Sequence, residues 1–178
     1  MTPIAKALIG AYYGKPPERS YYVGHAEGGR EAIALSHAFP DYYDGILAVG
    51  PRLNGRAASS DLTAFNRRGG KMIVVSNDAS IEWWARVDAG EAAIGESASS
   101  FVRLFAVNGL DDRFDAFAAL VDWVEKGLIP DRIIATARDT TPLPGQTRPL
   151  CAYPQRARYI GIGSFEDANN FACRDAAP

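Results

Sequence analysis

The residues that could do chemistry stand together in one short stretch, residues 20–30. A β-branched and aromatic run over residues 20–23 ends in a glycine-rich corner, and an apolar helical pattern follows at once. Strand, tight turn and helix are the geometry of a nucleophile elbow, whose motif is G-x-S-x-G. Here the frame reads Gly24-x-Ala26-x-Gly28, so the turn is predicted but a methyl group stands where the attacking hydroxyl should be. Losing such a serine costs a hydrolase on the order of 10⁶ in rate.

Three titratable side chains could rebuild a weaker site around this corner. His25 could act as a base if it is exposed in a cleft, or it could simply fill space as a polar residue. The backbone N–H of Glu27 is the oxyanion donor that a hydrolase would use, while its carboxylate is expected to interact with the helix dipole. Asp78 follows a predicted strand, where it could cap the next helix or approach His25 across the strand ends. His37, the other histidine, is expected on a helix surface.

The glycines of residues 24–29 could instead cradle a phosphate at the start of a helix. The sequence lacks both the Gly-Lys-Ser/Thr ending of a P-loop and the G-x-G-x-x-G spacing, and Glu27 would repel an anion. Cys151 and Cys173, the two cysteines, have no metal-ligand spacing. We therefore expect neither a nucleotide cofactor nor a metal.

The elements that must position this stretch alternate along the chain. Strands are predicted over residues 20–24, 45–49, 71–75, 101–107 and 133–135. Helices are predicted over residues 2–13, 28–39, 59–67, 78–89 and 111–127. This alternation predicts an α/β fold with a mostly parallel sheet flanked by helices. From residue 140 to residue 178, prolines and glycines predict an irregular tail wrapped on the body.

Length and charge limit the partners. At 178 residues the chain is one domain by the length prior. The net charge of −2 argues against nucleic acid or an anionic membrane as a partner. No run has the length of a transmembrane helix, and the N-terminus shows no signal peptide.

Several stretches of the chain resemble the tannase and feruloyl esterase family, and they occur in the family's order. They are residues 5–9, 13–17, 20–30, 39–46, 70–74, 101–105, 114–135, 147–154 and 168–173. The resemblance implies an α/β-hydrolase fold with an inserted lid, and hydrolysis of aromatic carboxylic esters.

The resemblance also shows what this chain lacks. The family has a serine at Ala26 and a cysteine at His25, a carboxylate in the loop after the third strand here, and a His-Cys pair after the fourth. Here the chain continues directly into Ser76-Asn77-Asp78 and into residues 108–112, without those groups. The lid is reduced to the residues between Pro51 and Phe65, and the family's strands before the first helix are absent.

Three functional hypotheses remain open from the sequence. The first is a catalytically inactive, cut-down scaffold of the family. The second is a weak esterase using His25, Glu27 and Asp78. The third is a non-catalytic binder of small aromatic acids or esters. The resemblance further implies a Cys151–Cys173 disulfide and a secreted or periplasmic location, and a partial sheet could expose an edge through which copies associate.

Overall fold

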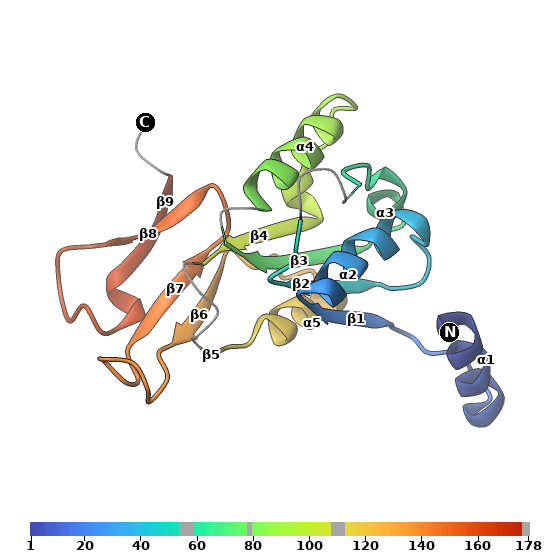
Figure 1. Ribbon diagram of the computed structural model, residues 1–178, viewed down its shortest axis with the longest axis horizontal. Helices are drawn as coiled ribbons and strands as arrows, with labels where there is room; N and C mark the ends of the chain where they lie inside the picture. Colours follow the sequence, from blue (N-terminus) through green and yellow to red (C-terminus); the bar gives the residue numbers. More distant parts are fainter. Residues whose placement is uncertain (54–58, 78–79, 108–112, 176–178) are drawn as a thin grey trace.

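The computed structural model describes residues 1–53, 59–77, 80–107 and 113–175. Four parallel strands form a sheet in the order β1-β2-β3-β4 (Figure 1). They are β1 (Tyr21–His25), β2 (Gly45–Val49), β3 (Lys71–Ser76) and β4 (Val102–Ala106). The alternation of strands and helices thus gives the predicted parallel sheet, and the carboxyl ends of all four strands meet at one edge.

Alternate residues of the central strands supply two separate cores. On one face Ile46 and Met72 belong to an apolar cluster that also includes residues of α2, α3 and α4. On the other face Leu47 and Ile73 belong to a cluster with residues of α5. Every residue of β2 is buried, which is the pattern of a strand covered on both faces.

Helices cover both faces of this sheet. They are α2 (Glu27–Ala38), α3 (Thr63–Arg67), α4 (Ile81–Ala92) and α5 (Ala116–Lys126), whereas α1 (Thr2–Tyr13) buries none of its residues. Figure 1 shows α2, α3 and α4 on one side of the parallel strands and α5 on the other. Asp115 caps α5, because its carboxylate accepts a hydrogen bond from the backbone N–H of Ala118 at 2.8 Å. Gly127 ends α5 in the left-handed conformation at φ 71°.

Some helices differ from the sequence prediction in their bounds or packing. The helix expected over residues 111–127 begins only at Ala116, because Arg113 and Phe114 form the short strand β5. The polar helix expected over residues 59–67 is helical only from Thr63 to Arg67. The first helix forms as expected but buries none of its residues, so its apolar side chains Ile4 and Leu8 are exposed. Helical periodicity predicts which side chains share a face, but it does not supply a surface for that face to pack on.

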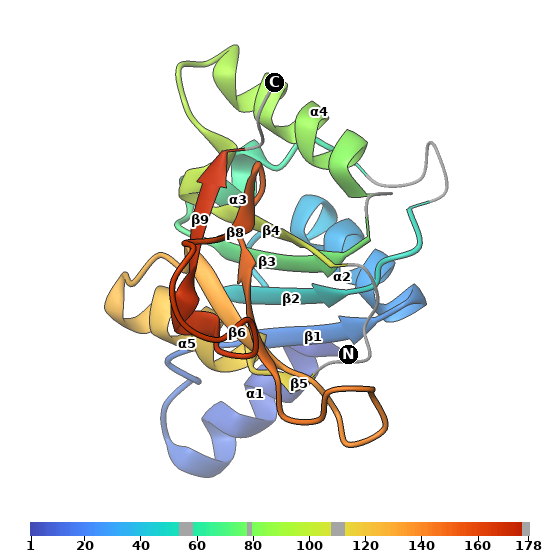
Figure 2. The same cartoon turned by 90° about the vertical axis from the view of Figure 1, so that its left-hand side faces the viewer.

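The tail expected to be irregular over residues 140–178 contains three strands, at residues 147–151, 155–159 and 171–175. A three-stranded antiparallel sheet joins β5 (Arg113–Phe114), β6 (Arg132–Thr136) and β7 (Thr147–Cys151), and a hairpin joins β8 (Gln155–Tyr159) and β9 (Phe171–Asp175). Figure 2 shows β8 and β9 running across the direction of the parallel strands. Prolines such as Pro149 argue against strands in the sequence. The strands form nevertheless, because they depend on pairing with distant residues rather than on local propensity.

Backbone contacts at β4 join the antiparallel part to the parallel sheet. Phe105 of β4 forms a β-bridge with Ala152, and the backbone N–H of Tyr153 donates to the carbonyl of Leu104 at 2.7 Å. The adjacent Cys151 is disulfide-bonded to Cys173 of β9, which confirms the pairing implied by the family resemblance.

Candidate functional site

The corner between β1 and α2 has the backbone of a nucleophile elbow. Ala26 adopts φ 51° and ψ −110°. Among the residues that the structure describes, it is the only one other than glycine with a positive φ. A residue with a β-carbon pays a strain of roughly 1–3 kcal/mol in such a conformation. The sequence prediction of a sharp strand-turn-helix corner at Ala26 is therefore confirmed.

Two glycines allow the close approach of strand and helix at this corner. A β-carbon on Gly24 would lie 2.1 Å from the carbonyl oxygen of Gly28, which no backbone could accommodate. A β-carbon on Gly29 would lie 3.1 Å from the carbonyl oxygen of Val49. At Gly28 nothing would come within 4 Å. Steric contacts therefore require glycine at positions 24 and 29. They do not require it at Gly28, although Gly28 completes the motif in the sequence.

Backbone hydrogen bonds fix the corner to the neighbouring strand. The N–H of Ala26 donates to the carbonyl of Val49 at 2.9 Å, and the carbonyl of Ala26 accepts from the N–H of Arg30 at 3.1 Å. The Ala26 methyl group thus occupies a fixed place at the carboxyl edge of the sheet, which is where ligands bind in open α/β folds.

The structure does not bring the sequence-predicted site residues together in one site. His25 is exposed and lines a cleft. The Glu27 carboxylate instead forms an ion pair with Arg30 at 2.8 Å and is not among the residues lining that cleft. Glu27 is also the first residue of α2, and an N–H at this position has no partner within its helix. Asp78 lies outside the described residues, and His37 is exposed with Nδ1 2.8 Å from the carbonyl oxygen of Asp61.

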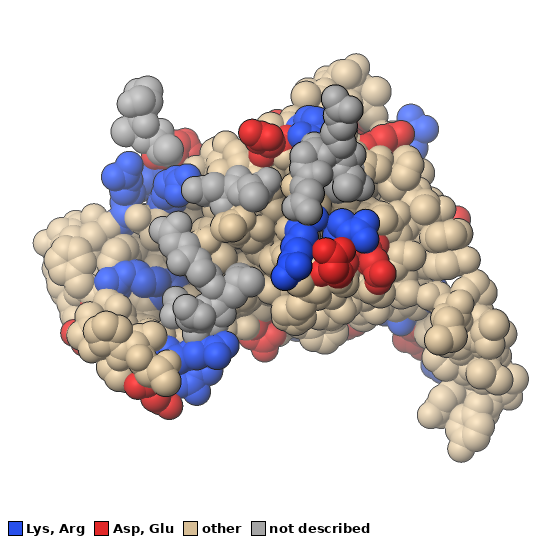
Figure 3. All heavy atoms as spheres, in the orientation of Figure 1, with Lys and Arg blue, Asp and Glu red and all other residues tan. Residues whose placement is uncertain are grey.

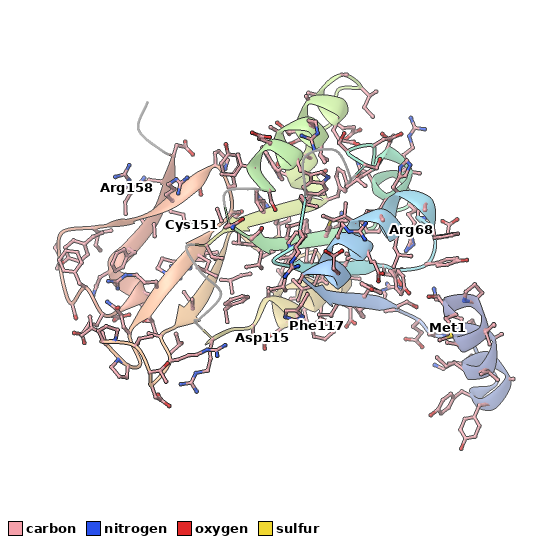
Figure 4. The ribbon with its side chains drawn as sticks, viewed as in Figure 1. Met1, Arg68, Asp115, Phe117, Cys151 and Arg158 are labelled. Atoms are coloured by element: carbon pink, nitrogen blue, oxygen red, sulfur yellow. A yellow bond between two sulfur atoms is a disulfide. The ribbon has the colours of Figure 1, made fainter. Side chains whose placement is uncertain are left out.

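The cleft beside the corner has a volume of about 490 Å³ and lies between β1, β2 and the start of α5. Its lining is aromatic, aliphatic and charged: His25, Leu47, Val49, Arg113, Phe114, Asp115, Ala116, Phe117 and Arg138. Figure 4 labels Asp115 and Phe117 where β5 leads into α5. The cleft therefore combines aromatic rings with guanidinium groups, which suits a planar anion.

The charged groups of the cleft are not equally available. The Asp115 carboxylate is engaged in capping α5. Arg113 forms an exposed ion pair with Asp139 at 3.2 Å. The Arg138 guanidinium has no ion pair within the described ranges. Sequence reasoning missed both arginines, because only the antiparallel pairing of Arg113 with Thr136 brings their segments together.

The groups that would complete a serine esterase are not found among the described residues. His25 and His37 are the chain's histidines, and neither forms a hydrogen bond or ion pair with a carboxylate of a described residue. Residues 78–79 and 108–112, which come after β3 and β4 in the sequence, lie outside the described ranges. Within those ranges no three His, Cys, Asp or Glu side chains gather closely enough to hold a metal ion.

Comparison with known proteins establishes the family. The family model described as "Tannase and feruloyl esterase" matches residues 1–56 and 52–174, which together span most of the chain. The chain therefore belongs to the tannase and feruloyl esterase family. The two matches overlap at residues 52–56, in the segment where the family resemblance predicts a reduced lid.

Individual relatives agree with this assignment. A mono(2-hydroxyethyl) terephthalate hydrolase of Piscinibacter sakaiensis is 44% identical over 138 residues, which are 68% of this chain and 22% of the relative. An uncharacterized esterase of Xanthomonas campestris is 34% identical over 165 residues, with 67% of this chain and 28% of the relative covered. The chain thus spans about a quarter of the length of these relatives.

The solved structures show the fold. Feruloyl esterase B from Aspergillus oryzae superposes with a TM-score of 0.79 at 16% identity, covering 97% of this chain and 73% of that one. An esterase from the same organism gives a TM-score of 0.80 at 14% identity, covering 97% and 72%. The fold is that of an α/β hydrolase, as the family resemblance implies.

Proposed function

We propose that this chain is a catalytically inactive member of the tannase and feruloyl esterase family, which keeps the elbow and has lost its chemistry. The observation that carries the proposal is Ala26, whose methyl group stands at the strained corner where the family has a serine. Acyl transfer needs a nucleophile, a base with its orienting carboxylate, and an oxyanion hole. Of these, the described residues offer only the backbone N–H of Glu27.

The test is an ester hydrolysis assay on the unmutated chain with methyl ferulate and a nitrophenyl ester. We expect no turnover above a boiled control. Ala26→Ser should also stay inactive, because no histidine base is placed to take its proton. Sustained turnover by the unmutated chain would refute the proposal, and loss of that turnover in His25→Ala would favour the alternative of a rebuilt site at His25, Glu27 and Asp78.

A second candidate function is non-catalytic binding of a small aromatic acid or ester. It is favoured by the cleft, where the rings of Phe114 and Phe117 lie near Arg138. The rings could pack on an aromatic ligand, and a guanidinium can hold a carboxylate in bidentate fashion.

Titration of the chain with ferulate, followed by NMR or calorimetry, tests this candidate. We expect saturable binding without product formation, weakened several-fold by Arg138→Gln and unchanged by Arg86→Gln, an exposed arginine on α4. Equal binding by both variants, or no binding at all, would exclude the cleft as the ligand site.

The disulfide supports a location outside the reducing cytosol. A Cys151–Cys173 bond persists in secreted or periplasmic surroundings and is reduced in the cytosol. Fractionation of cells that express the natural gene would test this assignment, and recovery of the reduced protein from the cytosol would contradict it.

A further inference from the structure

The β8–β9 hairpin places three arginines on one face. In the antiparallel register Arg156 lies directly opposite Arg174, and Arg158 follows two residues along β8 on the same side. The opposite side of the hairpin carries Cys173 opposite Ala157, and Cys173 is bonded to Cys151 of β7. The arginine face therefore points away from β7.

Among the described residues, the three guanidinium groups have no partners of their own. In the described part of the chain none of them forms an ion pair or a side-chain hydrogen bond. All three residues are exposed. Like charges directly opposite each other destabilise an antiparallel pair, so Arg156 and Arg174 repel each other in the isolated molecule. An external anion would relieve this repulsion.

Exposed apolar side chains continue the same row. The N–H of Ile160 donates to the carbonyl of Asn170 at 3.0 Å, so the ladder extends past Arg158 and Ile160 lies on the arginine side. Ile160 is 53% exposed, and Ile162 in the following loop is 74% exposed. The loop is held by its own hydrogen bonds, including Tyr159 Oη to the carbonyl of Gly163 at 2.6 Å.

The negative charges of the hairpin lie elsewhere. The Glu166 carbonyl accepts from the N–H of Thr147, which places this acidic part of the loop beside the start of β7. Asp175 lies opposite Gln155, on the side away from the arginines. Figure 3 shows the blue atoms gathered at the β8–β9 end, and Figure 4 shows Arg158 extending outward at the end of the molecule opposite Met1.

We propose that this face, defined as Arg156, Arg158, Arg174, Ile160 and Ile162, docks the protein on an anionic lipid surface. The order of the groups matches such a surface. Ile160 lies about 7 Å beyond Arg158 along the strand, and an interfacial apolar group sinks roughly 5–10 Å below the headgroups. Insertion of the isoleucines would thus bring the guanidiniums to the level of the lipid phosphates, where arginine binds well.

Other polyanions fit the face less well. Single-stranded nucleic acids bind where aromatic side chains stack on the bases, but Tyr159 and Phe171 lie on the opposite side of the hairpin, facing β7. A soluble anionic polymer would explain the arginines but not the exposed isoleucines. No helix in the described ranges is long and apolar enough to cross a membrane, so the contact is peripheral. The net charge of −2 argues against such a partner for the molecule as a whole, but the charge is unevenly distributed.

The test is flotation of the full chain with vesicles of phosphatidylcholine, with and without about one third phosphatidylglycerol, at low and high salt. We expect binding to the anionic vesicles only, weakened by salt. The triple variant Arg156→Gln, Arg158→Gln, Arg174→Gln should lose roughly 100-fold in partitioning, given the contribution of each arginine near an anionic surface. Ile160→Ser with Ile162→Ser should weaken binding without changing its salt dependence.

The matched control is the triple variant Arg67→Gln, Arg86→Gln, Arg132→Gln, which removes the same charge from exposed arginines elsewhere. It should bind like the unmutated chain. The hairpin variant should melt at the same temperature or higher, because it removes a like-charge pair. Equal loss in both triple variants would overturn the proposal. So would binding to a soluble polyanion or DNA with no binding to vesicles.

Discussion

At the corner between β1 and α2, Ala26 has the strained backbone conformation that would expose a nucleophilic side chain. The methyl group of alanine gains nothing from this conformation. Glycine would remove the strain of roughly 1–3 kcal/mol, but it adds unfolded-state entropy worth roughly 0.5–1 kcal/mol. We expect Ala26→Gly to be neutral or mildly stabilising in thermal melting, and Ala26→Val to be clearly destabilising. A melting temperature that falls sharply with glycine and holds with valine would contradict this reading of the corner.

The neighbouring glycines give a matched pair of substitutions. Gly24→Ala should destabilise the protein severely, because the added carbon would lie 2.1 Å from a backbone oxygen. Gly28→Ala should be neutral or stabilising by up to about 1 kcal/mol, since Gly28 lies in α2 with open space around it and alanine favours helix. Urea denaturation measures both variants, and similar losses in the two would show that the corner is not as tightly packed as described.

The sequence predicts this corner well and the cleft beside it poorly, for a physical reason. A strained turn depends on glycines and a β-branched run that are adjacent in the chain. Arg113 and Arg138, in contrast, reach the cleft only because β5 pairs with β6. No pattern in the local sequence predicts the pairing of β5 with β6, and β5 is only two residues long.

Between elements, one hydrogen bond links β1 to α5 and makes the fold sensitive to alkaline pH. Tyr21 Oη donates to Glu125 Oε1 at 2.8 Å, and burial, together with that carboxylate, raises the pKa of Tyr21 to about 12. Because the pKa is higher in the folded state than the ordinary value near 10, this contribution to stability is complete below pH 10 and is lost as the pH rises through 12.

Tyr21→Phe should therefore lose less stability than the unmutated chain between pH 10 and pH 12, as followed by denaturant unfolding at each pH. Tyr12→Phe is the control, since Tyr12 is 82% exposed and has no such carboxylate partner among the residues that the structure describes. Parallel pH profiles for the unmutated chain and Tyr21→Phe would show that the Tyr21 bond does not contribute.

The hairpin is fastened to the body by its disulfide. Cys151 and Cys173 enclose a separation of 22 residues, and closing a loop of this length contributes roughly 3 kcal/mol in the chain-entropy model. The double substitution of both cysteines by serine should lower the free energy of unfolding by about that amount. Two titratable thiols in the oxidised native protein would show that the bond does not form.

The sequence predicts the parallel strands but not the strands β7 and β8. The parallel strands are short runs rich in apolar, β-branched and aromatic residues, so their length and local composition predict them. β7 contains Pro149 and β8 contains exposed arginines, and both become strands through partners more than ten residues away. Their formation is a property of the assembled fold rather than of the segment.

At the scale of the molecule, β1 is an unpaired edge. In the part of the chain described, β1 pairs only with β2, and Val23 on it is 47% exposed. Such an edge can pair with its own copy, since an antiparallel strand pair is self-complementary about a two-fold axis.

We expect concentration-dependent dimerisation in analytical ultracentrifugation, abolished by Val23→Lys. Ile94→Lys is the matched control, because Ile94 is 51% exposed at the far end of α4 and should leave association unchanged. A monomer at all concentrations would mean that the exposed edge does not mediate self-association.

The disulfide between β7 and β9 also decides how the molecule would respond to mechanical load. A pull applied at Asp175 reaches Cys173, crosses the disulfide to Cys151, and passes along β7, which is paired with β6. The residues between the two cysteines bear no tension while the bond is intact, so about 75 Å of contour length stays hidden. Reduction would release that length before the parallel sheet yields, and the same chain would thus be short and stiff when oxidised and extensible when reduced.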